Sequence, residues 1–425
     1  MNSNFRIQKA NIFVEERAKK INDDLNNVLK MIQNVKSEND NLKRMYDLSI
    51  IHLLQIQNDI EMNHSILNKL REKVEKIKSI DGNNYSGNFE NSINYSEHLD
   101  ENEEPQTINM DWNIEPNINS IKLKFSLKIN GIICSISFQE TGECIAFCNG
   151  KTAFLVSSIN GELIQSFDIP NPNRIIDYTP RSIKFSPDSQ YLALGGPNNT
   201  VIIYSLNQKK IVANLEGHHK QISALLFSND SKILYSGGYD GLICIWDIPK
   251  LCLKQIIRSQ TNPIGEMIIS LSKDSDEYFI AAGLLNGVVG VYDPLFQQPM
   301  NAFQAHDNNS CILDVSVSPF DGTLATSAND KTIKIWGIHG VASCRKTLHD
   351  HTDLVLTICF SPKQTLCFTG SKDETIKGWD YKKGDLLFTI KGHKNTLFEI
   401  SHHPSEKAFA SCSGDGVVCV WEYDI

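Results

Sequence analysis

The spacing of apolar residues over positions 5–80 predicts one long helix. Neither proline nor glycine occurs before Gly82, and apolar residues recur at alternating intervals of three and four. An unbroken 3.5-residue period is typical of a left-handed coiled coil, whereas a helix packed on a globular core follows a 3.6-residue period. We therefore predict a coiled-coil oligomerisation domain over residues 1–80. Its seam is Val14, Ala18, Ile21, Leu25, Val28, Ile32, Val35, Asn39, Leu42, Tyr46, Ser49, Leu53, Ile56, Ile60, Asn63, Leu67, Leu70, Val74 and Ile77.

Two features of this seam concern the number of associating helices. Asn39 at a seam position either fixes the register of the coil or is simply tolerated there. Between residues 45 and 56 the apolar face widens, because Met45, Leu48 and Leu54, among others, lie off the seam. A two-stranded coil would leave these side chains in water, so we expect three or four strands, at least in this part.

Residues 121–425 carry short alternating segments and a much longer repeat. An aromatic residue recurs every 42 to 46 residues, and a short polar residue lies six positions before each one. A period near 43 residues with this Trp–Asp type of signature is typical of a β-propeller built from four-stranded blades. Seven strand-rich units can be counted, so we predict an all-β, seven-bladed WD-repeat β-propeller. The pairs are Asn198–Tyr204, Asp240–Trp246, Asn286–Tyr292, Asp330–Trp336, Asp373–Trp379 and Asp415–Trp421.

The seventh unit needs a fourth strand from elsewhere in the chain. The sequence reaches Ile425 just after the third strand of this unit. Residues 121–129, IKLKFSLKI, precede the first unit and alternate apolar with polar positions. We predict that this segment closes the ring, which would remove an exposed sheet edge.

Four of the units share a polar set that resembles a catalytic triad. In each unit a His precedes the first strand, a Ser or Thr ends the second, an Asp follows in the turn, and a Trp lies on the third. Four copies of one triad on one domain would be unusual, whereas repeats commonly copy a structural hydrogen-bond network. We interpret these sets as structural tetrads and predict no catalytic residue. The tetrads are His218, Ser236, Asp240, Trp246; His306, Thr326, Asp330, Trp336; His351, Thr369, Asp373, Trp379; and His393, Ser411, Asp415, Trp421.

Residues 81–120 have the composition of a disordered linker. They hold nine acidic residues and no Lys or Arg, and the other 41 acids of the chain are balanced by 41 bases. Such a segment cannot bury enough apolar surface to order itself. Within it, Ile108, Met110, Trp112 and Ile114 alternate with polar residues. Trp112 is either part of a docking strand for a partner or rests on the rim of the propeller, and we favour the rim.

Several other functional classes are not supported by the sequence. No eighteen-residue apolar run, signal-peptide core or basic stripe for DNA occurs. The eleven cysteines form no CxxC pair, so we expect buried thiols and neither a metal site nor a cofactor. The phosphate-binding, HExxH and GxGxxG motifs are missing too. We interpret His402 and His403 as surface residues.

The order of these parts, together with several blade sequences, resembles the Tup-type transcriptional corepressors, fungal relatives of Groucho. The matching segments are RSIKFSPDSQYLALGG (181–196), FIAAGLLNGVVGVYD (279–293), HTDLVLTICF (351–360), FTGSKDETIKGWDYKKGDLLFTIKGHKNTL (368–397) and ASCSGDGVVCVWEYDI (410–425). The resemblance implies a nuclear, non-enzymatic scaffold whose coil tetramerises and binds a tetratricopeptide-repeat corepressor. It also implies that the propeller binds sequence-specific DNA-binding repressors, and that the linker contacts core histone tails. The linker here is much shorter than is usual in that family, although its acids could attract Lys-rich tails.

The resemblance places partner binding on the loop-rich top face of the propeller. We expect the contacts to come from loops before the first strands and from turns between second and third strands, because mixed aromatic, amide and charged side chains suit a docking surface. These candidate residues are Tyr178, Arg181, Gln221, Tyr239, Asn329, Asp353, Lys372 and Asn395.

Two alternatives have the same layout. One is a cytoplasmic coiled-coil and WD-repeat scaffold, such as the adaptor of the autophagy conjugation machinery, for which a dimer is expected. The other is a ubiquitin-ligase or splicing factor of the coil-plus-propeller type. That class would need a U-box before the coil, and we expect no room for one ahead of residue 5.

Overall fold

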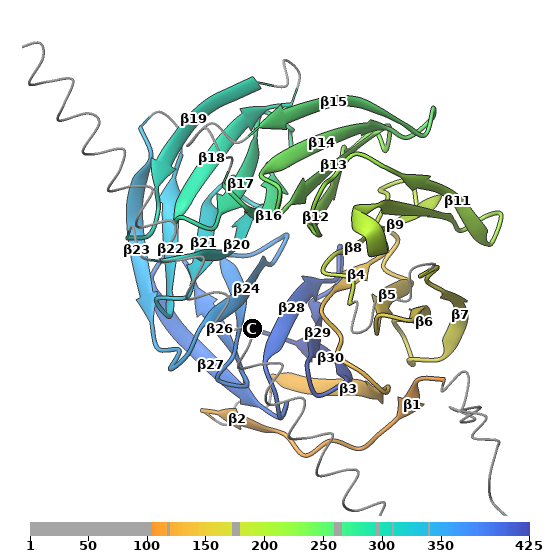
Figure 1. Cartoon of the computed structure of the whole chain (residues 1–425). Helices are drawn as coiled ribbons and strands as arrows, with labels where there is room; N and C mark the ends of the chain where they lie inside the picture. The colour runs from red at the N-terminus through yellow and green to blue at the C-terminus, as the bar shows by residue number, and fades with distance from the viewer. Residues whose placement is uncertain are drawn as a thin grey trace, which may run out of the picture. The chain divides into compact units, whose positions relative to one another are not determined.

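Seven antiparallel sheets form a ring of blades, as expected for a β-propeller (Figure 1). The computed structural model describes residues 104–116, 120–171, 179–258, 266–294, 298–307, 310–338 and 341–425. These belong to one compact unit, His98–Ile425. The predicted coil, most of the linker and Tyr178 lie outside the described residues. Within the described residues no helix is long and apolar enough to span a membrane.

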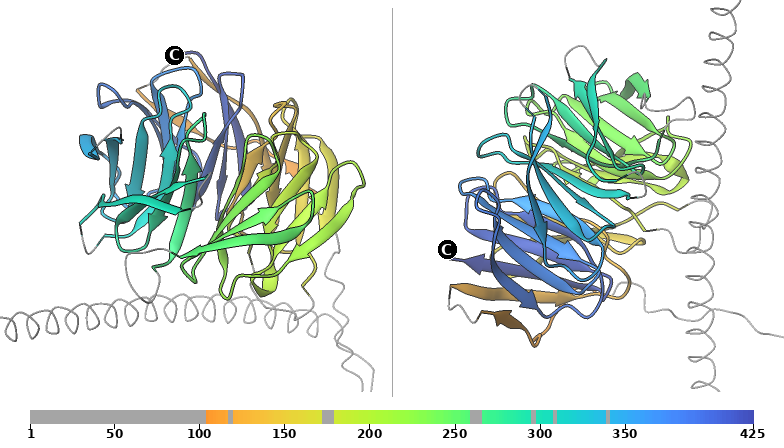
Figure 2. Two further views of the ribbon diagram at one scale, coloured as in Figure 1. Left: turned by 90° about the horizontal axis from the view of Figure 1, so that it is seen from above. Right: turned by 90° about the vertical axis from the view of Figure 1, so that its left-hand side faces the viewer.

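Each blade runs from an innermost strand near the centre to an outermost strand at the rim (Figures 1 and 2). The innermost strands are β4 (Ile136–Phe138), β8 (Ile183–Phe185), β12 (Ile222–Phe227), β16 (Ile268–Lys273), β20 (Ile312–Val317), β24 (Val355–Phe360) and β28 (Leu397–His402). The second strands are β5 (Cys144–Cys148), β9 (Tyr191–Gly195), β13 (Ile233–Gly238), β17 (Ile280–Leu284), β21 (Leu324–Ala328), β25 (Leu366–Ser371) and β29 (Ala408–Ser413). We number the blades one to seven in this order.

The third strands carry the periodic aromatic residues, and the fourth strands form the rim. The third strands are β6 (Thr152–Ser157), β10 (Val201–Ser205), β14 (Leu242–Asp247), β18 (Val288–Asp293), β22 (Thr332–Gly337), β26 (Thr375–Asp380) and β30 (Val417–Tyr423). In blades one to six the fourth strands are β7 (Leu163–Asp168), β11 (Lys210–Leu215), β15 (Cys252–Arg258), β19 (Gln298–Gln304), β23 (Ser343–His349) and β27 (Asp385–Lys391).

Blade seven takes its fourth strand from the segment that precedes blade one. β3 (Ile121–Lys128) pairs antiparallel with β30, from Ile121 opposite Tyr423 to Lys128 opposite Val417. Its residues Ile121 and Leu127 are buried in two different core clusters. The start of the propeller is therefore joined to its end, at the segment where the sequence analysis placed a closing strand.

Residues 104–116 are ordered, although the sequence analysis expected the whole linker to be disordered. β1 (Gln106–Thr107) pairs with the outer edge of β3, and β2 (Asn113–Glu115) pairs with the outer edge of β27. Between these strands Trp112 packs edge-on against Trp421, with ring centroids 5.5 Å apart. Composition alone missed this order because the alternating apolar side chains pack against a surface that only the folded blades provide. We call residues 104–116 the strap.

His403 is buried, which corrects its interpretation as a surface residue. Its Nε2 donates to the carbonyl oxygen of Gly142 in blade one at 3.1 Å, and its Nδ1 accepts the backbone N–H of Glu406 at 2.9 Å. A Cβ atom at Gly142 would lie 2.3 Å from the imidazole, and Gly142 has a φ of +80°. His403 therefore links blade seven to blade one. Its neighbour His402 is partly buried, and burial lowers the pKa of His402 to about 4.

Candidate functional site: tetrads and inner ring of the top face

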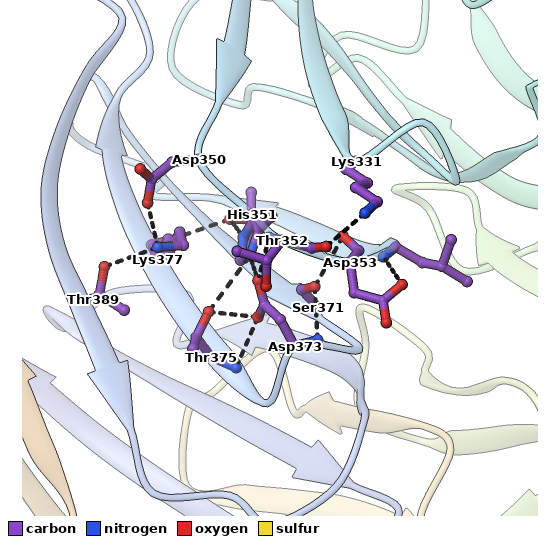
Figure 3. Close-up of polar contacts among 12 residues, drawn as sticks. Lys331, Asp350, His351, Thr352, Asp353, Ser371, Asp373, Thr375, Lys377 and Thr389 are labelled. Atoms are coloured by element: carbon purple, nitrogen blue, oxygen red, sulfur yellow. Dashed lines mark hydrogen bonds and ion pairs between the residues drawn. The ribbon is translucent and has the colours of Figure 1, made fainter.

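The structure brings together the members of all four tetrads. In blade six, the indole N–H of Trp379 donates to Thr369 Oγ1 at 3.0 Å, and the same oxygen lies 2.8 Å from His351 Nε2. His351 Nδ1 lies 2.8 Å from Asp373 Oδ2 (Figure 3). Because the hydroxyl accepts from Trp379, its hydrogen is directed to Nε2, so Nδ1 carries the proton donated to the carboxylate. The same contacts recur in the sets of His218, His306 and His393.

The tetrad geometry is unsuited to nucleophilic catalysis. The candidate nucleophiles Ser236, Thr326, Thr369 and Ser411 are each 0% exposed. Their oxygens are also occupied by an indole donor on one side and an imidazole on the other, so no substrate atom can approach them. What the tetrad does is hold the loop before the first strand against the turn after the second. In blade six this is completed by Asp373 accepting the backbone N–H of Thr352 at 2.9 Å.

The tetrad carboxylates are stabilised in their charged form. Burial alone would raise the pKa of Asp330, but hydrogen bonds from His306 and Thr332 outweigh it and lower the pKa to about 2. The pKa values of Asp240, Asp373 and Asp415 are lowered in the same way, against the effect of burial. The turns of the top face are therefore held by charge-assisted hydrogen bonds, which are stronger than neutral ones.

The candidate partner-binding residues divide into turn-stabilising residues and freely exposed ones. Asn329, Asp353 and Asn395 each accept a backbone N–H from a nearby residue, at 2.7 to 2.8 Å. Gln221 Nε2 lies 3.4 Å from the carbonyl oxygen of Thr179, and Gln221 O accepts the backbone N–H of Tyr239. Lys372 is exposed and lies 3.9 Å from Asp353, while Arg181 is exposed.

Asp353 is tied to the tetrad turn of its own blade. Its carbonyl oxygen accepts the Ser371 hydroxyl at 3.2 Å, and Ser371 Oγ accepts the backbone N–H of Asp373 (Figure 3). Lys331 of blade five donates to the carbonyl oxygen of Thr352 at 2.8 Å. Lys331 therefore links the blade-five turn to the loop that precedes the first strand of blade six.

An inner ring of apolar side chains was missed by the sequence reasoning. The innermost strands β16, β20, β24 and β28 each contain a β-bulge after their first residue. In each strand one residue has no partner on the neighbouring strand: Ile269 in β16, Leu313 in β20, Leu356 in β24 and Phe398 in β28. All four side chains are partly exposed. A bulge redirects the side chain it carries. The four residues thus lie at one level around the centre, on neighbouring blades.

Arg181 occupies the corresponding place on blade two. It lies two residues before Ile183, as Leu356 lies two residues before Ile358, and both isoleucines donate their N–H to a side chain of the preceding blade. We define the inner ring as Arg181, Ile269, Leu313, Leu356 and Phe398. It combines four apolar side chains with one exposed cation. The sequence does contain a signal for this ring. In each of the four strands an apolar residue stands directly before Ser270, Asp314, Thr357 or Glu399, where the apolar–polar alternation of the strand is interrupted.

Below the inner ring, side chains of one blade accept backbone N–H groups of the next. Glu399 additionally accepts Lys184 Nζ at 2.6 Å, and Asp314 accepts the Ser270 hydroxyl at 2.6 Å. These contacts join blades that share no sheet. The N–H and acceptor pairs are Ile136 with Glu399, Ile183 with Ser135, Ile358 with Asp314, and Ile400 with Thr357, at 2.9 to 3.2 Å.

Replacing Asp314 by Asn is expected to change how the stability of the propeller depends on pH. Burial raises the pKa of Asp314 to about 6 in the fold, above its ordinary 3.8. The unfolded chain ionises this acid near pH 3.8, whereas the folded protein does so only near pH 6. The contribution of Asp314 to the free energy of unfolding is therefore lost as pH rises from about 4 through 6. Urea unfolding should therefore show Asp314→Asn gaining stability over the wild type between pH 4 and 7.5, by at most about 3 kcal/mol. Asp330→Asn should instead show a nearly constant deficit over the same interval, because the contribution of a carboxylate with a lowered pKa is lost only as pH falls below about 4. Parallel profiles for the two variants would contradict this account.

No metal-binding group of three or more His, Cys, Asp or Glu residues occurs in the described parts of the chain. All eleven cysteines are free thiols. Burial raises the pKa of Cys144, Cys244 and Cys359 to about 12, so these thiols are held in their neutral form.

The repeated four-stranded blades and their tetrads define a WD-repeat β-propeller, a class of typically non-catalytic interaction scaffolds. Residues 384–422 match the model of the WD domain, G-beta repeat. Residues 151–379, more than half of the chain, match the model described as nucleolar protein 10-like, N-terminal domain. The chain belongs to this nucleolar protein 10-like family of propellers.

Three curated relatives each match slightly more than a third of the chain. Pre-mRNA-processing factor 17 of Saccharomyces cerevisiae is 27% identical over 158 residues, which are 36% of this chain and 34% of that protein. Periodic tryptophan protein 2 of Arabidopsis thaliana is 26% identical over 37% of this chain and 17% of that protein. Pre-mRNA-processing factor 19 of Bos taurus is 23% identical over 36% and 29%. The matched part thus spans about a third or less of each relative's length.

Proposed function

We propose that this chain is a non-catalytic scaffold that docks a partner protein on the inner ring of its top face. The observation that carries this proposal is the combination of Ile269, Leu313, Leu356 and Phe398 with the exposed Arg181. A peptide or short helix with apolar residues and one nearby carboxylate would complement this surface. Buried apolar anchors would supply most of the affinity, and the charge pair would orient the peptide.

The assembly we propose for it is one of nuclear RNA processing. Support comes from the family, whose description is nucleolar, and from relatives whose names are pre-mRNA-processing factors. This class includes the splicing-factor alternative that the sequence analysis set aside for want of a U-box. A nuclear location is part of the same proposal.

A second candidate is the general transcriptional corepressor. The observation that favours it is the likeness of several blade sequences, among them 181–196 and 410–425, to the Tup-type proteins. In this version the inner ring docks DNA-bound repressors, and residues 5–80 form a homo-tetramer that binds a tetratricopeptide-repeat partner. Core histone tails would then be attracted by the acids of residues 81–120.

Changing the inner ring is expected to separate these two functions in the native cell. We would replace the chromosomal copy by Leu356→Glu or Arg181→Glu, with Ile164→Glu as the control, because Ile164 is 59% exposed on the rim strand β7. In quantitative affinity purification, each ring variant should recover its main partner in an amount at least about tenfold lower than the wild type does, since central anchors dominate interface energies. The control should retain it, and all three should melt as the wild type does.

The identity of the lost partner and the RNA phenotype decide between the candidates. Loss of pre-mRNA-processing components with retention of introns is expected from the first candidate. If the ring variants instead lose DNA-binding repressors, derepress genes and splice normally, the corepressor function would replace the RNA-processing function. Ring variants that keep every partner of the wild type would refute docking on the inner ring.

A further inference from the structure

A cavity of about 540 Å³ lies at the top of blade two, and none of the described residues of its lining belongs to the inner ring. Its walls come from the turn between β9 and β10, from the end of β11 with the loop that follows, and from Pro170 after β7. This volume is within the range of ordinary small-ligand pockets. The lining residues are Pro170, Pro197, Asn198, Asn199, Thr200, Ile202, Asn214, Glu216, Gly217, His218 and His219.

Blade two lacks the side chains of a tetrad. Leu194 stands at the Ser or Thr position and has no hydroxyl, and Asn198 stands at the Asp position. Tyr204 replaces the tryptophan, and its hydroxyl contacts Gln165 of the rim strand β7. Phe167 stacks on the Tyr204 ring at 3.8 Å. The aromatic residue is thereby engaged with blade one and does not support the turn.

The cavity walls are held in place by the backbone. In the turn, Gly196 N–H donates to the carbonyl oxygen of Thr200 at 2.6 Å. Asn198 and Asn199 have φ values of +60° and +62°, a region that costs energy for residues other than glycine and often marks functional sites. On the other side, His219 N–H donates to Asp240 Oδ2 of the blade-three tetrad at 2.8 Å. The cavity is therefore preformed.

Glu216 gives the cavity its charge. It is exposed, and in the described part of the chain it forms no ion pair or hydrogen bond through its carboxylate. Among the described residues of the lining it is the only acidic one, and none of these residues is Lys or Arg. A carboxylate at this place attracts a cation.

The remaining lining suits a peptide more than a simple ion. The amides of Asn199 and Asn214 can each donate and accept, as a peptide backbone requires. Ile202 is 1% exposed and, with Pro170 and Pro197, provides an apolar surface. Such a surface covers the methylene groups of a long basic side chain while its charged end reaches a carboxylate.

We propose that this cavity binds a short peptide segment through a lysine or arginine side chain paired with Glu216. The site is separate from the inner ring and does not depend on the function proposed for it. It gives the propeller a second recognition point, for a basic segment, on blade two.

Direct binding to the full chain tests this proposal. The probes are acetyl-arginine methylamide and acetyl-lysine methylamide, and the neutral acetyl-norleucine methylamide serves for comparison. Their binding is measured by saturation-transfer NMR at low salt. The cationic probes should bind saturably and more tightly than the neutral one. Glu216→Gln should weaken the cationic probes about two- to fivefold, as expected for an exposed ion pair. Asn214→Trp should abolish binding by filling the cavity.

Two matched variants make the result specific. Glu374→Gln removes an exposed acid from the blade-six turn and should leave binding unchanged, as should Leu356→Glu in the inner ring. Unchanged melting temperatures would show that each variant is folded. The proposal would be overturned if no probe bound saturably, if cationic and neutral probes bound equally, or if neither cavity variant changed binding. None of these results would bear on the docking function proposed for the inner ring.

Discussion

Deleting residues 121–128 from the full chain is expected to abolish folding of the propeller. The deletion removes β3, and with it the buried side chains of Ile121, Phe125 and Leu127. Each such side chain contributes about 1.5–3 kcal/mol on burial, so the sum approaches the whole stability of a typical domain. It also exposes the edge of β30, which pairs with β3 along its length. Circular dichroism and limited proteolysis of the deletion variant measure this loss.

Deleting the strap, residues 104–116, is the matched control. Its strands β1 and β2 form only five paired positions, and blades six and seven keep four strands each without it. This variant should remain folded and melt a few degrees lower, because about 1 kcal/mol shifts the melting temperature of a domain this large by a few degrees. A soluble Δ121–128 protein that melts like the strap deletion would show that the ring does not depend on β3.

Thr369→Val is expected to destabilise the propeller by about 3 kcal/mol. Valine fills the same volume but leaves the indole N–H of Trp379 and Nε2 of His351 without their partner in a fully buried place. A buried polar group that loses its hydrogen bond costs about 1–3 kcal/mol, and here two groups are affected. Urea unfolding at pH 7 followed by tryptophan fluorescence measures the change.

Thr347→Val is the control for the same change of side chain. Thr347 is exposed on the rim strand β23, where substitutions rarely change stability by more than about 0.5 kcal/mol. The tetrad of blade six is expected to give the large effect because Asp373 and the loop from His351 to Thr352 are held through it. Equal effects at Thr369 and Thr347 would mean that the tetrad contributes no more than its apolar atoms.

The tetrads and the blade count followed from the sequence because they are local within one repeat. His351, Thr369, Asp373 and Trp379 lie within 29 positions of one another, and the same offsets recur in blades three and seven. A repeated pattern of residues at fixed spacing therefore predicts a repeated network. The same reasoning applies to the apolar–polar alternation of residues 121–129, which the structure places beside β30.

The contacts between blades were beyond the reach of that reasoning. Ile136 and Glu399 are 263 positions apart, and Trp112 and Trp421 are separated further still. Nothing in the local sequence of the strap shows that folded blades would offer it two strand edges. His403 was interpreted as a surface residue because it belongs to a lone histidine pair in the degenerate start of blade seven, yet ring closure brings Gly142 against it.

By itself, then, the sequence determined the periodic parts of this protein: seven blades, four tetrads and the segment able to close the ring. Those features depend on residue order within about 43 positions, where chain connectivity brings the partners together. Only the tertiary structure decided the order of the strap, the inner ring, the raised pKa of Asp314 and the cavity of blade two. The physical reason is that each of these arises from neighbouring blades, so burial and contact there are fixed by closure of the whole ring.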